Sequence, residues 1–200
     1  MSRNGAGRLA AEASDAVETI LGAGDAAALS AAYPQALNVI GHSLDREKKA
    51  VLSTAVFTPE RDYSAIAASW TEPLDALALS YRNSAGRIFK ESCAALKLKP
   101  VPPGLSPDEI AWSKVIPVRS PDFVCPLELD YLVEKLGPGV TERIKLRGYA
   151  AYEAISFADG RRSILDIARA VAAEYEPQNI RDVGDFFSLL AEAGLFSLKK

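Results

Sequence analysis

The residue types that most often perform chemistry are scarce in this chain of 200 residues. It has a single histidine, His42, and two cysteines, Cys93 and Cys125. A general base needs a nucleophile or an orienting carboxylate within reach, and no motif around His42 provides one. The cysteines are far apart and lack the Cys-x-x-Cys spacing of zinc and thiol-redox sites. We therefore expect no catalytic residue, no metal ligand and no cofactor site, and we interpret these three side chains as structural.

Glycine-rich phosphate loops are not indicated either. The pairs Gly5-x-Gly7 and Gly22-x-Gly24 lack the third glycine of a dinucleotide-binding loop, and neither follows a predicted strand. We interpret both pairs as helix breaks.

The composition is that of a protein with a packed core and no membrane-spanning segment. Hydrophobic residues make up 48% of the chain, but the wholly apolar runs are short. The first 22 residues lack the uninterrupted apolar stretch of a secretory signal, so we expect a soluble protein in the cytoplasm. With 23 basic and 26 acidic residues, the formal net charge of −3 gives no electrostatic footprint for general nucleic-acid binding.

Residues 1–98 are predicted to form a helical domain, either a bundle or a long hairpin. Apolar residues recur at helical spacing in three runs. Asp25 is the expected N-cap of the second run and Thr71 that of the third. Pro73 would then lie in the first turn of the third helix, where a missing N–H costs little. The fold class we expect is therefore mainly α.

Residues 99–126 are predicted to be an extended strap. Seven of the twelve prolines fall there, and proline favours extended backbone over long helices. The segment also carries large apolar side chains, among them Trp112 and Ile116, which a free tether would lack. We expect it to lie across a protein surface, with one short helical turn beginning near Ser106.

Residues 127–200 are predicted to form a winged-helix-like domain with a small β-sheet. Residues 143–147 alternate strictly between charged and apolar side chains, as a half-buried strand does. Three helices follow, and the second begins with a capping box between Ser163 and Asp166. Residues 195–198 are expected to close the sheet against 143–147.

Six basic side chains of this domain are the candidate contacts for a peptide or protein partner. A strand over 143–147 would present three of them at the edge of the sheet, where unpaired backbone groups accept an extended peptide. The alternative is that all six are ordinary solvated surface charges. The candidates are Arg143, Lys145, Arg147, Arg161, Arg162 and Arg181.

A winged helix also raises the question of DNA binding. The last predicted helix, which Asn179 is expected to cap, carries Arg181 against three acidic residues, Asp182, Asp185 and Glu192. This balance would repel phosphate, whose neutralisation provides most of the non-specific affinity for DNA. We do not expect this helix to bind nucleic acid.

Three phrases within 152–196 carry a family resemblance. They are Phe-x-Asp-Gly-Arg-Arg-Ser-x-Leu-x-Ile at 157–167, Ala-Val-x-Ala-Glu-Tyr at 170–175 and Leu-x-x-Ala-Gly-Leu at 190–195. Together they resemble the C-terminal winged-helix region of bacterial aminopeptidase-like proteins, which belong to the di-zinc exopeptidase superfamily (aminopeptidase Y type). The same residues are more weakly similar to pyrroloquinoline-quinone biosynthesis D-type domains, which bind leader peptides by adding them to a sheet edge.

The first resemblance implies a parent metallopeptidase whose zinc ligands lie on a large α/β domain. This chain has one histidine, so no catalytic or metal residue carries over, and the chain itself is expected not to be an enzyme. The favoured function is a non-catalytic accessory region of such a peptidase, serving substrate gating, domain packing or oligomerisation. The alternatives are a stand-alone peptide- or protein-binding adaptor that uses the sheet edge and, less favoured, a DNA-binding regulator. The chain would then be either the tail of a longer peptidase or a free-standing relative.

Overall fold

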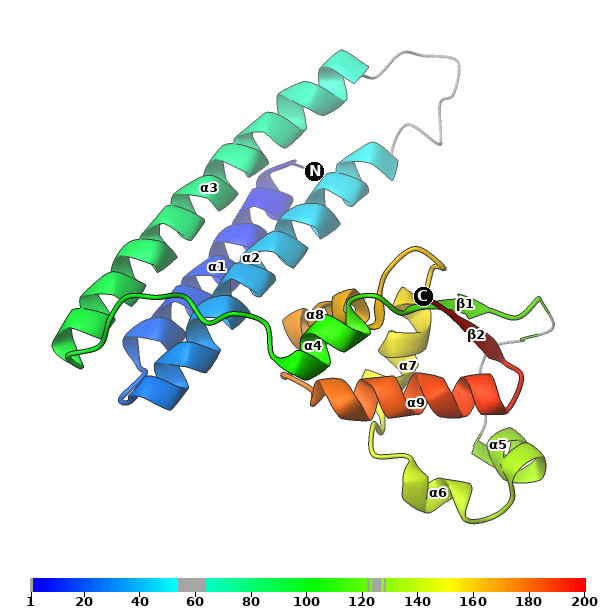
Figure 1. Cartoon of the computed structure of the whole chain (residues 1–200). Helices are drawn as coiled ribbons and strands as arrows, with labels where there is room; N and C mark the ends of the chain where they lie inside the picture. The colour runs from blue at the N-terminus through cyan, green and yellow to red at the C-terminus, as the bar shows by residue number, and fades with distance from the viewer. Residues whose placement is uncertain (1, 54–63, 122, 124–126, 128) are drawn as a thin grey trace. The chain divides into compact units, whose positions relative to one another are not determined.

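The protein is mainly helical and contains a small two-stranded antiparallel sheet (Figure 1). The computed structural model describes residues 2–53, 64–121, 123, 127 and 129–200. The chain divides into two compact units, unit 1 over residues 1–103 and unit 2 over residues 104–200. Each unit has a hydrophobic core of its own.

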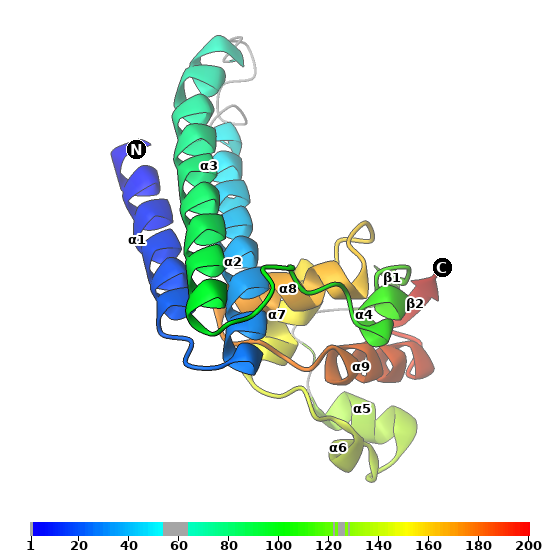
Figure 2. The same ribbon diagram turned by 60° about the vertical axis from the view of Figure 1, so that its left-hand side comes forward.

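Unit 1 is a bundle of three long helices, α1 (Ser2–Leu21), α2 (Ala26–Ser53) and α3 (Ser64–Ala95). Each helix packs against the other two, and Figure 2 shows all three side by side. The apolar stripes predicted from the sequence meet in the centre of this bundle. The core includes Leu9, Ala13, Ile20, Leu29, Ala36, Ile40, Leu74, Ala78, Ala85 and Phe89.

The predicted start of the second helix is confirmed, whereas that of the third is wrong. The Asp25 carboxylate accepts a hydrogen bond from the backbone N–H of Ala28 at 2.8 Å, as an N-cap does. α3, however, already begins at Ser64, and Pro73 lies in its interior. Proline removes one backbone hydrogen bond from a helix, but the buried side chains that follow it, beginning with Leu74, hold the helix against the bundle.

Unit 2 is built from six helices and two short strands among the residues that the structure describes. In chain order these are α4 (Pro107–Trp112), β1 (Ile116–Arg119), α5 (Leu129–Leu136), α6 (Val140–Arg143), α7 (Tyr149–Phe157), α8 (Ile164–Glu174), α9 (Ile180–Glu192) and β2 (Phe196–Lys199). Its core is centred on Phe187, which is fully buried and meets Phe186 and Phe196 edge to face.

The starts of α4, α8 and α9 agree with the sequence, whereas the short helix α6 was not predicted. Ser163 and Asp166 form the predicted reciprocal capping box at the start of α8. Asn179 caps α9 by accepting a hydrogen bond from the backbone N–H of Arg181. Ser106 begins α4 with a second capping box, closed by Glu109.

The sheet is made from a different strand than predicted. β2 pairs antiparallel with β1, in a register that joins Ile116 to Lys199 and Arg119 to Phe196. β1 lies inside the predicted strap, so this part of the strap belongs to the sheet of unit 2. Residues 143–147 form no strand, since Arg143 ends α6 and the following residues pair with no neighbouring strand.

The alternation that suggested a strand over 143–147 is nonetheless present in the structure. Ile144 and Leu146 are buried, whereas Arg143, Lys145 and Arg147 are exposed. The segment is therefore a connection with one apolar side, and it lacks the backbone ladder that defines a strand.

Candidate functional site

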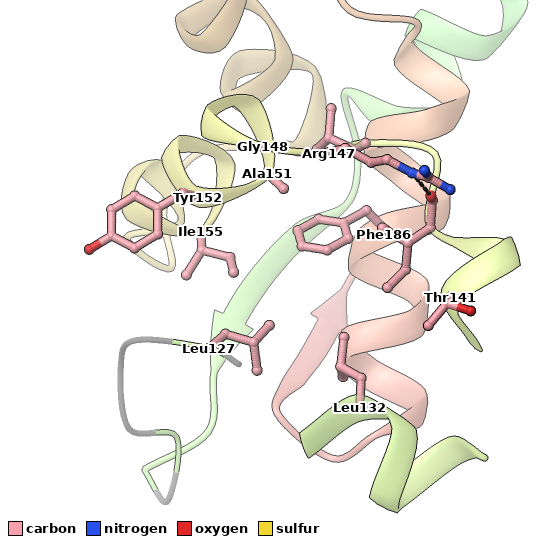
Figure 3. Close-up of a pocket in the computed structure, with 11 residues that line it drawn as sticks. Leu127, Leu132, Thr141, Arg147, Gly148, Ala151, Tyr152, Ile155 and Phe186 are labelled. Atoms are coloured by element: carbon pink, nitrogen blue, oxygen red, sulfur yellow. Dashed lines mark hydrogen bonds between the residues drawn. The ribbon is translucent and has the colours of Figure 1, made fainter. Parts of the chain in front are cut away.

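Unit 2 contains an apolar pocket of about 430 Å³ (Figure 3). This volume lies within the range of about 300–1,000 Å³ that is typical of ligand sites. The lining residues are Leu127, Leu132, Thr141, Ile144, Leu146, Arg147, Gly148, Ala151, Tyr152, Ile155 and Phe186.

Several separate segments build the pocket wall. α7 contributes Ala151 and Ile155, which lie one helical turn apart on the same face. α9 contributes the ring of Phe186, which Figure 3 shows between α7 and the segment that follows α6. The connection after α6 contributes its buried side, Ile144 and Leu146, so the alternation in this segment has a role in the wall.

Arg147 is the one charged residue among the described residues of the wall. Its Nε donates a hydrogen bond to the carbonyl oxygen of Ile144 at 3.1 Å, which holds the guanidinium against the pocket rim (Figure 3). Its neighbour Gly148 has φ +62°, a conformation that favours glycine, and lies at the N-cap position directly before α7. The positive φ turns the chain from the extended segment into the helix that forms the opposite wall.

A row of exposed tyrosines begins at the pocket. Tyr152 lines the pocket and is 54% exposed, and Tyr149 lies one turn before it on α7 and is 78% exposed. The ring of Tyr149 stacks on that of Tyr175, with centroids 6.5 Å apart and ring planes 2° from parallel. Partial burial and the nearby Glu153 carboxylate, which accepts a hydrogen bond from the Tyr175 hydroxyl, raise the pKa of Tyr175. We call Tyr152, Tyr149 and Tyr175 the tyrosine row.

The structure separates the three cations of 143–147 by their partners. Arg143 forms a two-point ion pair with Glu192 of α9 and lowers the pKa of that carboxyl by hydrogen bonding. Lys145 lies 3.9 Å from Asp182 at the other end of the same helix. Arg147 has no carboxylate partner among the residues that the structure describes.

The other three predicted cations do not join the pocket. Arg162 lies over the Phe157 ring and donates to the Phe157 carbonyl, in the turn where Arg161 is exposed. Arg181 is bound to Asp108 of α4 at 2.6 Å. α9 thus carries acidic residues next to an arginine that is already paired.

The bundle of unit 1 contains a charge cluster that sequence reasoning missed. Glu47 is 2% exposed, and its carboxylate accepts hydrogen bonds from Arg8 Nε and Nη2 at 2.9 and 2.7 Å. Arg46 donates to the neighbouring Glu12 carboxylate, which also accepts a hydrogen bond from Ser43. The hydrogen bonds from Arg8 hold the pKa of Glu47 below its usual value despite its burial.

Gly5 makes room for this cluster. A Cβ at position 5 would come within 2.7 Å of a Glu47 carboxylate oxygen. The expectation that Gly5 and Gly7 break a helix is therefore wrong, since both lie inside α1. A Glu at position 47 has no signal of its own in the sequence, because its burial depends on α1 packing against α2.

Neither His42 nor Cys93 is among the lining residues of the pocket. His42 lies in α2, Cys93 is a buried free thiol in α3, and Cys125 falls outside the described residues. Within the described part of the chain, no three His, Cys, Asp or Glu side chains are close enough to hold a metal ion. None of the described helices has the length and apolar character needed to span a membrane.

Comparison with known proteins adds no relative to this picture. No family model, no curated protein and no solved structure matches the chain. The resemblance of 152–196 to the tails of aminopeptidase-like proteins therefore stays a prediction from the sequence.

Proposed function

We propose that the chain is a protein- or peptide-binding protein whose second unit takes an apolar side chain of its partner into the pocket. The apolar pocket is the observation that carries this proposal, because the described part of its wall is formed mainly by aliphatic and aromatic side chains and has one charged residue, Arg147. The binding surface therefore differs from the one suggested by the sequence, which placed an extended peptide along 143–147.

The tyrosine row supports a macromolecular partner rather than a small metabolite. Exposed aromatic side chains beside an apolar pocket are typical of protein interfaces, where Tyr is enriched among the residues that provide most of the binding energy. Tyr149, at 78% exposed, extends the apolar surface well beyond the pocket. A bound segment of several residues would cover both features, whereas a small molecule in the pocket would leave the row uncovered.

The accessory-region function predicted from the sequence is one form of this proposal. The partner would then be the catalytic domain of an aminopeptidase-like protein, and the chain would assist it without chemistry of its own. Zinc-dependent hydrolysis of aminoacyl-nitroanilides by the purified chain would contradict this form. Failure to hydrolyse them, with stimulation of a peptidase captured by the chain, would support it.

Two further features belong to the proposal. We describe unit 2 as winged-helix-like, because β1 precedes and β2 follows the three helices α7, α8 and α9 in the chain. In this description β1 takes the role of the strand predicted over 143–147.

We place the protein in the cytoplasm, where a buried free thiol such as Cys93 stays reduced.

Photo-crosslinking in the cells that make the protein tests the proposal. Benzoylphenylalanine at position 149 should give one discrete adduct with a partner protein. Ala151→Phe places a ring in the pocket and should remove the adduct, whereas Ala191→Phe on α9, outside the lining residues, should keep it. An adduct that survives Ala151→Phe, or the lack of any discrete adduct, would contradict the proposal.

A further inference from the structure

The geometry points to the C-terminus of the partner as the segment that binds: an apolar last side chain fills the pocket, and the terminal carboxylate binds Arg147. This inference rests on the proposed function and adds the chemical identity of the bound end. Two observations carry it, the apolar wall and the guanidinium at its rim.

A hydrogen bond holds the guanidinium of Arg147 at the edge of the pocket, where it can bind an anion. Both partners of the hydrogen bond from Arg147 Nε to the Ile144 carbonyl belong to the pocket wall. This hydrogen bond engages Nε of the guanidinium and neither of its terminal nitrogens, Nη1 and Nη2. No described carboxylate lies within ion-pair distance of Nη1 or Nη2. Arg143 and Lys145, by contrast, face acidic side chains of α9.

A C-terminal residue satisfies both parts of this site at once. It is the one position of a polypeptide where a carboxylate and an apolar side chain are attached to the same Cα. Arginine binds carboxylates through two parallel charge-assisted hydrogen bonds, which are shorter and stronger than neutral ones. An apolar side chain from the interior of a chain would fill the pocket but would present a neutral amide to Arg147.

The tyrosine row provides a surface for the partner residues that precede the bound C-terminus. It runs from Tyr152 at the pocket to Tyr149 and Tyr175, which are all exposed. The penultimate residues of an extended segment would cover these rings and bury apolar surface.

Fluorescein-labelled peptides test the inference on the full chain by fluorescence anisotropy. Three peptides are compared. The first is Gly-Ser-Gly-Ser-Gly-Ala-Val-Leu as the free acid, and the second is the same peptide as the C-terminal amide. The third is extended by Gly-Ser after the leucine, so that the leucine is internal. We expect the acid to bind at least about tenfold more tightly than the other two, because amidation removes the charge that faces Arg147.

Two variants assign the effect to the site. Arg147→Gln should weaken binding of the acid about tenfold and leave the amide unchanged, while Arg161→Gln, an exposed arginine outside the wall, should change neither. Equal affinity for acid and amide, with both lost in Ala151→Phe, would overturn the C-terminal inference and leave the proposed function intact. If none of the three peptides bound, or if binding were unchanged in Ala151→Phe, both the C-terminal inference and the proposed function would be overturned.

Discussion

The indole ring of Trp112 occupies the space that a side chain at Gly184 would need. A Cβ at position 184 would lie 2.2 Å from Cε2 and 2.3 Å from Cζ2 of that ring. Since α4 carries Trp112 and α9 carries Gly184, this contact fixes how closely α4 approaches α9. Nearby, Arg181 of α9 binds Asp108 of α4 at 2.6 Å and joins the same two helices at the surface.

Gly184→Ala is therefore expected to destabilise unit 2. Overpacking a filled site costs about 1–3 kcal/mol, whereas replacing glycine by alanine within a helix gains at most about 1 kcal/mol. We expect a net loss in the free energy of unfolding, measured by urea titration. The matched control is Gly7→Ala in α1, where nothing lies within 4 Å of the added Cβ, and it should be neutral or stabilising. Equal effects of the two substitutions would contradict the close contact at Trp112.

The Arg8–Glu47 pair predicts a pH dependence of the stability of unit 1. Because the pKa of Glu47 is lower in the folded state than its ordinary value of 4.5, the pair stabilises the fold above that value. This stabilisation is lost progressively as the pH falls from 4.5 to below the lowered pKa of Glu47. Glu47→Gln should therefore flatten the fall of the unfolding free energy with pH in this range. Glu91→Gln, on the exposed surface of α3, is the control, and a slope as steep in Glu47→Gln as in Glu91→Gln would contradict the role of the pair.

Ser163→Ala should weaken the start of α8. The side chain accepts a hydrogen bond from the backbone N–H of Asp166 at 3.1 Å, and loss of an N-cap costs about 0.5–2 kcal/mol. Thermal unfolding followed by circular dichroism measures the effect. Ser156→Ala, whose hydroxyl donates to a carbonyl within α7, removes a surface hydroxyl of the same kind and should change the midpoint much less. A midpoint unchanged in Ser163→Ala would show that the capping box adds nothing.

The paired cations of 143–147 should matter little for partner binding. Arg143 and Lys145 already face Glu192 and Asp182, so an acidic peptide gains little new interaction from them. The double variant Arg143→Gln/Lys145→Gln should bind the leucine-ended peptide within about twofold of the parent chain, in contrast to Arg147→Gln. A loss in the double variant as large as that in Arg147→Gln would favour the edge surface suggested by the sequence.

The helices and their caps were largely readable from the sequence because their determinants are local. The capping box of Ser163 with Asp166 lies within one helical turn, and so does the cap that Asn179 provides. The start of α3 was missed because tertiary packing maintains the helix through Pro73, where local preference would end or begin it.

The sheet and the pocket depend on contacts between distant segments, which periodicity does not report. The pairing of β1 with β2 joins segments about 80 residues apart, and the proline content of the strap concealed β1. Alternation over 143–147 correctly predicted which side chains are buried but not whether the backbone has a strand beside it. The pocket required Ile155, Phe186 and Leu132 to come together from three helices.

The central claim is that the pocket of unit 2 binds an apolar side chain of a partner, and a methyl NMR titration tests it most directly. The full chain, labelled at Ile and Leu methyl groups, would be titrated with the leucine-ended octapeptide. We predict shifts confined to the pocket methyls of Leu132, Ile144, Leu146 and Ile155, with Ile20 and Ile40 of the bundle unchanged, and loss of these shifts in Ala151→Phe. Pocket methyls that do not respond, or shifts spread equally over the bundle, would contradict the account.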